Sequence, residues 1–165
     1  MTADTQSPDD PGSPPPIQQL DLEACHAILA RHRLCILSVV DGDAPYAVPL
    51  FYGFDGATLH LGLAEGRKTR ALDANPALCI TVTELGEGDA WASVQVTGVA
   101  EWVEEPAARA ESVRALMEHN RRIRALRRDA AGETAGAPGS PAPRRHGTGR
   151  ILRVADPQFT GRSRR

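Results

Sequence analysis

The sequence has a single lysine, Lys68, although lysine and arginine together number 19 among its 165 residues. Aromatic residues make up only 4% of the chain, so aliphatic side chains must form most of its core. No apolar run approaches the ~20 residues that span a bilayer, and we therefore expect no membrane segment.

The three cysteines are poorly placed for a disulfide framework or a zinc site. Their number is odd, each lies in an apolar stretch, and the chain has no CxxC pair or regular cysteine–histidine spacing. We expect Cys25, Cys35 and Cys79 to be reduced core residues of a cytoplasmic protein, and we expect no metal site.

The rest of the composition is that of a globular protein, with 41% apolar residues and a net charge of −2. This length allows one domain with a sizeable core, and the charge argues against a protein that coats nucleic acid. Residues 1–16, MTADTQSPDDPGSPPP, contain no large apolar side chain to offset the entropy of ordering, so we expect a disordered tail. They also lack the basic start and apolar run of a signal peptide. The predicted domain covers 17–159, with a flexible Gly-, Ala- and Pro-rich loop over 130–149 and a basic tail at 160–165.

Six apolar stretches are predicted to be strands of an antiparallel sheet. They lie at 34–40, 45–54, 57–63, 77–85, 90–105 and 150–159. Turn signals at 41–43 and 55–56 join the first three into a meander, and Gly98 suggests a bulge. Pro45 and Pro49 cannot donate to a ladder, so the second strand should be open on one side. Because closing a sheet removes exposed edges, we predict a mainly β fold, a small six-stranded antiparallel barrel with flanking helices.

Three helices are predicted beside these strands, over residues 21–33, 66–75 and 106–129. Asp21 can cap the first, and Pro106 opens the third. We expect the third helix to carry an apolar stripe formed by Val113, Leu116, Met117, Ile123 and Leu126.

The lone lysine lies in EGRKTR, at the predicted start of the short second helix. Backbone N–H groups in the first turn of a helix lack partners, and the helix dipole is positive there. Arg67, Lys68 and the Thr69 hydroxyl add donors, and Gly66 lets the chain approach a ligand closely. This pattern indicates a phosphate seat, although a helix start with two solvated cations also explains it. The GxxxxGK[ST] spacing of a Walker loop is absent.

The order of several short motifs resembles the pyridoxamine 5′-phosphate oxidase-like superfamily. They are PYAVP, DGATLHLGLAEGRK, the Asn-Pro pair after the short helix, and SVQVTGVA, and the resemblance covers roughly residues 21–105. Within that superfamily the chain is most similar to small proteins related to nitroimidazole reductase. The resemblance implies an FMN-binding split barrel that forms a homodimer with flavin at the subunit interface.

Two stretches match positions that contact the flavin ring in that superfamily. The backbone around Val48, Pro49 and Leu50 would face the isoalloxazine ring. Leu61 and Gly62, at the end of the third strand, would lie near the ring or the ribityl chain.

Further matches concern the flavin phosphate and the partner subunit. Arg67 and Lys68 match the pair that holds the FMN phosphate, and Gly66 and Thr69 would shape that seat. Ser93, in SVQVTG, matches a position that reaches the flavin held mainly by the partner subunit.

The chain departs from two particular members of the superfamily. Nitroimidazole reductase-like members often carry a histidine five residues before the glycine of GRK, and that position is Leu61 here. The neighbouring His60 should point to the opposite face of the strand, so the sequence gives no support to antibiotic reduction. The chain also lacks the C-terminal extension with which pyridoxamine phosphate oxidases hold their vitamin substrate, and we reject that activity.

Three functions are open on these grounds. The first is an FMN-dependent oxidoreductase that passes electrons from NAD(P)H to a small organic acceptor, with no side chain identified as catalytic. The second is a non-catalytic module that binds flavin, deazaflavin or haem, as other split barrels of the superfamily do. The third is an anion- or nucleic acid-binding protein that uses the arginine-rich run at 121–128, for which a solvated helix face is the simpler explanation.

Overall fold

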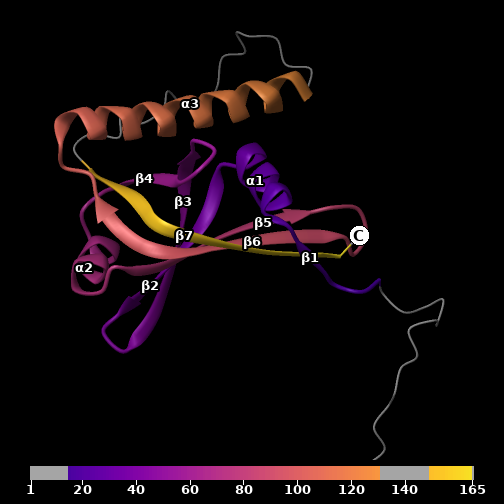
Figure 1. The fold of residues 1–165 in the computed structure, drawn as a ribbon, viewed down its shortest axis with the longest axis horizontal. Helices are drawn as coiled ribbons and strands as arrows, with labels where there is room; N and C mark the ends of the chain where they lie inside the picture. Colours follow the sequence, from indigo (N-terminus) through magenta and orange to yellow (C-terminus); the bar gives the residue numbers. More distant parts are fainter. Residues whose placement is uncertain (1–14, 131–148, 165) are drawn as a thin grey trace, which may run out of the picture.

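The computed structural model describes residues 15–130 and 149–164 (Figure 1). The predicted tail at 1–16 and the predicted loop at 130–149 lie almost wholly outside the described residues.

Six antiparallel strands close into a barrel, as the sequence predicted. They are β2 (Leu34–Asp41), β3 (Ala44–Phe54), β4 (Leu59–Leu63), β5 (Ala77–Leu85), β6 (Trp91–Trp102) and β7 (Arg150–Arg164). Their order is β7-β4-β3-β2-β5-β6, and β6 pairs again with β7, so the six strands form a closed ring. The register of β6 on β7 shifts between Thr97 and Val99, which confirms the bulge at Gly98.

Aliphatic side chains fill the barrel. Leu37, Ile80, Val94, Val96 and Leu152 are all fully buried. Each side chain of this kind stabilises the fold by about 1.5–3 kcal/mol relative to exposure. The low aromatic content of the chain is therefore compatible with a dense core.

The C-terminal strand is longer than predicted. The sequence indicated a basic tail at 160–165, but β7 continues to Arg164. Gly161 and Ser163 are buried within this extension, and arginines alternate with them, so the period is that of a strand although the composition is that of a tail. A Cβ at Gly161 would lie 2.6 Å from the Cys25 Sγ, so glycine is required where the strand passes the first helix. The extension pairs with β1 (Gln18–Leu20), a strand that was not predicted.

Three helices lie outside the barrel (Figure 1). α1 (Leu22–Arg31) begins at Asp21, whose carboxylate accepts a hydrogen bond from the Ala24 N–H at 2.8 Å, as the predicted cap requires. α2 (Arg67–Ala74) packs against β2, and α3 (Pro106–Ala130) packs against β3 and β4. Among the described residues, none of the helices combines the length and apolar character needed to cross a membrane.

The face that α3 presents to the barrel differs from the predicted apolar stripe. Ile123 is buried, but Met117 and Leu126 are 66% and 56% exposed. His119 is buried in their place, because its Nε2 donates to the His32 carbonyl at 2.7 Å. Hydrogen bonds to the backbone therefore fix this helix as much as apolar contact does, which a pattern of apolar residues cannot reveal.

A glycine sets the distance between α3 and the sheet. A Cβ at Gly53 would lie 2.4 Å from the Leu116 Cα, closer than any real contact. Leu116 itself is half-buried, and the Asn120 amide donates to the Tyr52 carbonyl at 2.9 Å. The helix backbone thus lies directly on β3, which places the C-terminal half of α3 beside the start of β2.

Candidate functional site

The predicted phosphate seat lies at the start of α2. Thr69 is fully buried, and its hydroxyl oxygen accepts a hydrogen bond from the Gly66 N–H at 3.0 Å. The same hydroxyl lies 2.9 Å from the Gly66 carbonyl oxygen, to which it can donate. Thr69 therefore closes the first helical turn and does not face solvent. With Thr69 engaged inside the chain, Arg67 and Lys68 are the residues left for the predicted phosphate contacts, which stay a prediction.

Arg67 is held at the tip of the hairpin formed by β2 and β3. Its guanidinium lies over the Tyr46 ring, 4.4 Å from the centroid, and its Nε donates to the Asp41 carboxylate at 2.5 Å. The Arg67 and Asp41 side chains are 53% and 34% exposed. An ion pair with this exposure is worth about 0–1 kcal/mol. A phosphate can therefore displace Asp41 at little cost while Tyr46 keeps the guanidinium in place.

Lys68 is half-buried and follows Arg67 in the first turn of α2. Within residues 15–130 and 149–164 its ammonium group takes part in no ion pair. Backbone N–H groups at this turn lack helical partners. The two cations and the helix start together supply the charge and the donors that a phosphate requires.

The predicted ring-binding strand, β3, is open along most of its length. β3 pairs with β2 from Ala44 to Phe51, whereas β4 pairs only with residues 52–54. No other strand in the described part of the chain pairs with residues 44–51. The prediction that this strand is open on one side is confirmed.

The register shows which backbone groups of β3 face β2. The Tyr52 N–H donates to the Arg33 carbonyl at 3.0 Å, and in an antiparallel ladder such bonded pairs recur at every second residue. Val48 and Leu50 fall on bonded positions, so their N–H and C=O groups point at β2. Their side chains are half-buried and pack against the core. These two predicted ring contacts have little to offer at the open edge.

The alternate positions of β3 face the open side. They include Pro45, Ala47 and Pro49, so both prolines lie where a missing N–H removes no ladder bond. The Ala47 N–H and the carbonyls of Ala47 and Pro49 point away from β2 at this edge. Ala47 and Pro49 both belong to the stretch 47–50 that the sequence predicted to hold the ring, and the parity of the two prolines along the strand indicates which side of it is open.

Leu61 and Gly62 lie within β4 and present no side chain to the open edge of β3. Leu61 is fully buried in the barrel, opposite Tyr52 of β3 and Leu152 of β7. A Cβ at Gly62 would meet the Leu116 side chain of α3 at 3.5 Å. A contact between these two residues and a flavin would have to come from their backbone, and it stays a prediction.

His60 points away from Leu61, as the strand period predicted. It is 5% exposed, and its Nε2 lies 2.9 Å from the Asp55 Oδ2. The position that holds a histidine in many nitroimidazole reductase-like proteins is thus occupied by a core leucine. His60 cannot replace it, because it lies on the other face of β4.

Ser93 is not brought to the phosphate seat within one chain. It is half-buried in β6, opposite Thr83 and Arg162. Ser93 is the third residue of β6, close to the turn between β5 and β6, and in Figure 1 this turn lies at the opposite end of the molecule from α2. Its predicted contact with flavin therefore requires a second chain.

Cys25 and Cys35 do not have the environment of reactive thiols. Burial raises the pKa of Cys35 to about 12. Burial, with the Asp21 carboxylate nearby, also raises the pKa of Cys25. All three cysteines are free; Cys25 and Cys35 are buried as predicted, whereas Cys79 is half-buried. The described residues contain no group of three His, Cys, Asp or Glu side chains placed to hold a metal ion.

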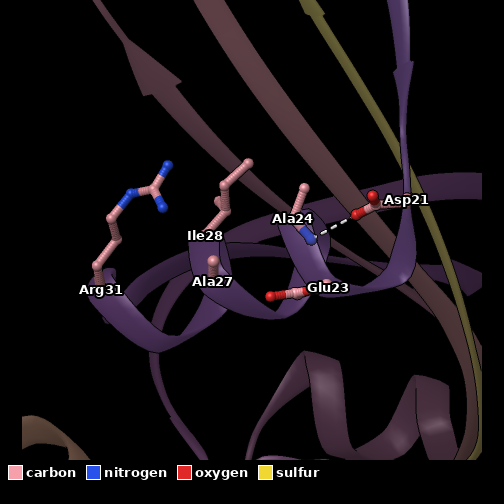
Figure 2. Close-up of a pocket in the computed structure, with 6 residues that line it drawn as sticks. All are labelled: Asp21, Glu23, Ala24, Ala27, Ile28 and Arg31. Atoms are coloured by element: carbon pink, nitrogen blue, oxygen red, sulfur yellow. Dashed lines mark hydrogen bonds between the residues drawn. The ribbon is translucent and has the colours of Figure 1, made fainter.

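Two hollows lie away from the predicted flavin residues. One, of about 310 Å³, runs along the exposed side of α1 from Asp21 to Arg31 (Figure 2). Two of its three charged groups are already engaged, because Asp21 caps α1 and Arg31 donates to Glu84 at 2.6 and 3.0 Å. The other, of about 610 Å³, lies between α3 and the β3–β4 hairpin and contains the pair formed by His60 and Asp55.

The sequence matches one family model. That model, described as pyridoxamine 5′-phosphate oxidase, matches residues 21–139. A comparison with curated proteins gives no match.

Solved structures share the fold. An FAD-binding protein from Mesorhizobium loti is 23% identical over 90% of this chain and 99% of its own, with a TM-score of 0.68. A protein from Bacteroides thetaiotaomicron with a suggested role in 5-nitroimidazole antibiotic resistance is 20% identical over 90% and 89%, with a TM-score of 0.65. A heme-binding protein from Mycobacterium smegmatis is 20% identical over 80% of this chain and 49% of its own, with a TM-score of 0.55. At these identities the similarity shows the fold alone.

Proposed function

The chain belongs to the pyridoxamine 5′-phosphate oxidase family, and on this premise we propose that it is a flavoprotein that binds FMN. Arg67 and Lys68 hold the phosphate in this proposal, and the open edge of β3 holds the ring. The proposed reaction is the transfer of electrons from NAD(P)H to a small organic acceptor.

The observation that carries the proposal is the position of the two cations next to the open strand edge. Arg67 rests on Tyr46, and Tyr46 directly precedes Ala47 on β3. From Tyr46 to Pro49 the strand rises roughly 10 Å, at ~3.3 Å per residue. A molecule with a phosphate at one end and a flat heterocycle with polar edges at the other can use both regions.

The groups of this chain provide binding and placement. The flavin, when bound, supplies the redox chemistry. Arg67 and Lys68 neutralise the phosphate, the Ala47 N–H donates to an acceptor on the ring edge, and the Pro49 carbonyl accepts from a ring N–H. Because the seat has one pair of cations, it suits the single phosphate of FMN better than the two phosphates of FAD.

We further propose a homodimer with the flavin at the subunit interface. The outer face of β2 and β3 exposes large apolar side chains, which are Leu34, Ile36, Val40 and Phe51. A contiguous apolar face of this kind marks an interaction surface. Ser93 lies on the same outer face, because the register runs from Ile36 through Thr81 to Gln95, two residues from Ser93. A second chain on this face would both cover the open edge and contribute its own Ser93.

The test of the proposal is the colour and the binding stoichiometry of the purified protein. We expect a flavin spectrum, or else uptake of one FMN per chain by the colourless protein, with weaker binding of riboflavin, which lacks the phosphate. FAD titrated in parallel distinguishes the two nucleotides. A protein that takes up neither FMN nor FAD would overturn the proposal.

A non-catalytic flavin, deazaflavin or haem module is the second candidate. The fold shared with the heme-binding protein from Mycobacterium smegmatis favours it, because the same scaffold accommodates a pigment other than flavin. A haem absorption band on purification would support this alternative. So would a flavin-loaded protein that neither NADH nor NADPH reduces under anaerobic conditions.

A further inference from the structure

The hollow of about 610 Å³ between α3 and the hairpin of β3 and β4 is large enough for a small organic molecule. It exists because α3 turns small side chains toward the hairpin. Ala108, Ser112 and Ala115 follow one another at helical spacing, and all three line the hollow. In Figure 1 α3 lies across the barrel above β3 and β4.

The buried part of this hollow is polar. Five polar side chains are buried among the described residues, and three of them line it: His60, Ser112 and His119, each at most 5% exposed. Burying a polar side chain costs free energy unless a partner satisfies it. His119 is satisfied, because it holds α3 to the His32 carbonyl at 2.7 Å. Packing gives no comparable account of His60.

His60 contributes a hydrogen-bond acceptor. Its Nε2 lies 2.9 Å from the Asp55 Oδ2, and the Asp55 Oδ1 accepts from the Ala57 and Thr58 N–H groups. Burial alone would raise the pKa of Asp55, but these three bonds lower it, so the carboxylate is ionised and can only accept. The shared proton is therefore on Nε2, which leaves Nδ1 of the neutral ring as an acceptor. Nδ1 is buried and has no hydrogen-bond partner among the described residues.

Two of the arginines that line the hollow are bonded within the protein. Arg153 donates to the Glu101 carboxylate at 2.7 Å. Arg122 donates to the Ala30 carbonyl at 3.2 Å. These bonds direct positive charge to other parts of the chain, so an anion gains less from the two arginines than their number suggests.

The carboxylates of the hollow are more available. Glu111 and Glu118 lie seven positions apart on α3, about two helical turns, and both line the hollow. Within residues 15–130 and 149–164 neither takes part in an ion pair, nor does Arg114 between them. The unpaired charges are therefore two negative and one positive.

We propose that this hollow binds a small organic amine in its ammonium form, held by His60, Glu111 and Glu118. An ammonium group has three donors and no acceptor, which matches a lining that offers acceptors and net negative charge. The site uses neither the cations of the FMN seat nor the open edge of β3. Its test is therefore independent of the flavin proposal.

Calorimetric titration with three four-carbon compounds tests the site. They are putrescine, a diamine; butanediol, its neutral counterpart; and succinate, its anionic counterpart. Near pH 8 an aliphatic amine, with a usual pKa of about 10, is cationic. We expect putrescine to bind at least about tenfold more tightly than butanediol or succinate, because only the diamine brings charged donors.

Two variants locate the binding. Glu111→Gln with Glu118→Gln should weaken putrescine binding about tenfold, since two charged hydrogen bonds are lost. The matched control is Glu87→Gln with Glu104→Gln, which has the same change in charge at exposed carboxylates outside the hollow. It should alter the affinity by less than about threefold. Ala108→Leu keeps every charge but fills the hollow, so it should also weaken binding about tenfold or more.

The ring nitrogens of His60 give a readout that diffuse attraction would not move. The ¹⁵N resonance of Nδ1 should shift when putrescine is added and stay in place when butanediol or succinate is added. Three results would overturn the inference: no measurable putrescine binding, an equal loss from the two glutamate pairs, or tighter binding of succinate than of putrescine. The last would mean that the arginines of the hollow hold an anion.

Discussion

Removal of the two cations at the start of α2 is the most direct test of the flavin proposal. The perturbation is Arg67→Ala with Lys68→Ala, measured as the single changes and together. Neither side chain contributes to the barrel core: Arg67 is exposed, and Lys68 is half-buried at the helix start. We therefore expect the variants to fold, and their far-ultraviolet circular dichroism and melting temperature serve as controls.

The structure gives different magnitudes for the two residues. A charged hydrogen bond to phosphate contributes about 1.5–3 kcal/mol, and ~1.4 kcal/mol is a factor of ten. Lys68 has no ion-pair partner to give up among the described residues, so Lys68→Ala should weaken FMN binding about tenfold to a hundredfold. Arg67 must first release Asp41, and that surface pair offsets about 0–1 kcal/mol, so Arg67→Ala should have a smaller effect. The double variant should lose at least about a hundredfold.

The same reasoning predicts a gain of affinity. Asp41→Asn removes the competitor for the Arg67 guanidinium, so FMN should bind up to about fivefold more tightly. Arg70→Ala is the matched control, because Arg70 is an exposed cation on the next turn of α2. The affinity of the Arg70→Ala variant for FMN should stay within about threefold of the wild-type affinity.

The assay is the quenching of flavin fluorescence, with riboflavin titrated beside FMN. Riboflavin lacks the phosphate, so the double variant and the wild type should bind it alike. Equal weakening of FMN and riboflavin would mean that Arg67 and Lys68 support the fold of the site and do not bind phosphate. Unchanged FMN binding in the double variant would refute the phosphate assignment altogether.

Packing and titration elsewhere in the barrel give three further predictions. Gly53→Ala should lower the free energy of unfolding in urea by about 1–3 kcal/mol, because the added methyl would overlap the Leu116 backbone; Gly62→Ala, with ordinary contacts, should change it little. The hydrogen bonds from Arg31 and then from His32 hold the pKa of Glu84 at about 2, below its usual 4.5. The ionised Glu84 carboxylate therefore stabilises the fold above pH ~4.5, and this contribution is lost toward pH ~2. Glu84→Gln should lower the free energy of unfolding at pH 7 and lower it progressively less below pH ~4.5. An equal loss of free energy at pH 7 and at pH ~2 would contradict this assignment. Burial lowers the pKa of His119, so the neutral form stabilises the fold above its usual pKa of 6.5 and this contribution is lost at lower pH. His119→Gln should therefore flatten the loss of stability between pH 7 and pH 5, and parallel profiles would show that another group is responsible.

Structural features that depend on residues close together in the sequence were predicted correctly. Asp21 caps α1 through the Ala24 N–H, and the two prolines of β3 mark a strand with one open side. The bulge at Gly98 also follows from a local feature, because a glycine inside a strand marks close backbone approach. Each of these depends only on the conformational limits of single residues and their neighbours.

Features that depend on distant partners were missed or wrong. The extension of β7 through Gly161 becomes visible only beside β1, because its composition is that of a basic tail. The buried face of α3 includes His119, whose partner is the carbonyl of a residue 87 positions away. The exposed Met117 has no such partner in the described structure, so the apolar pattern alone gave the wrong face.

Local sequence features specify most helices and strands of the chain, the start of α2 at Gly66, and the two cations that follow it. The surroundings of those cations depend on the folded chain, because pairing of β2 with β3 brings Asp41 and Tyr46 to Arg67. Likewise only the ladder register decided that Ala47 and Pro49 direct their backbone groups to the open edge. Strand pairing is a long-range choice, stabilised by a core that forms only when the barrel closes.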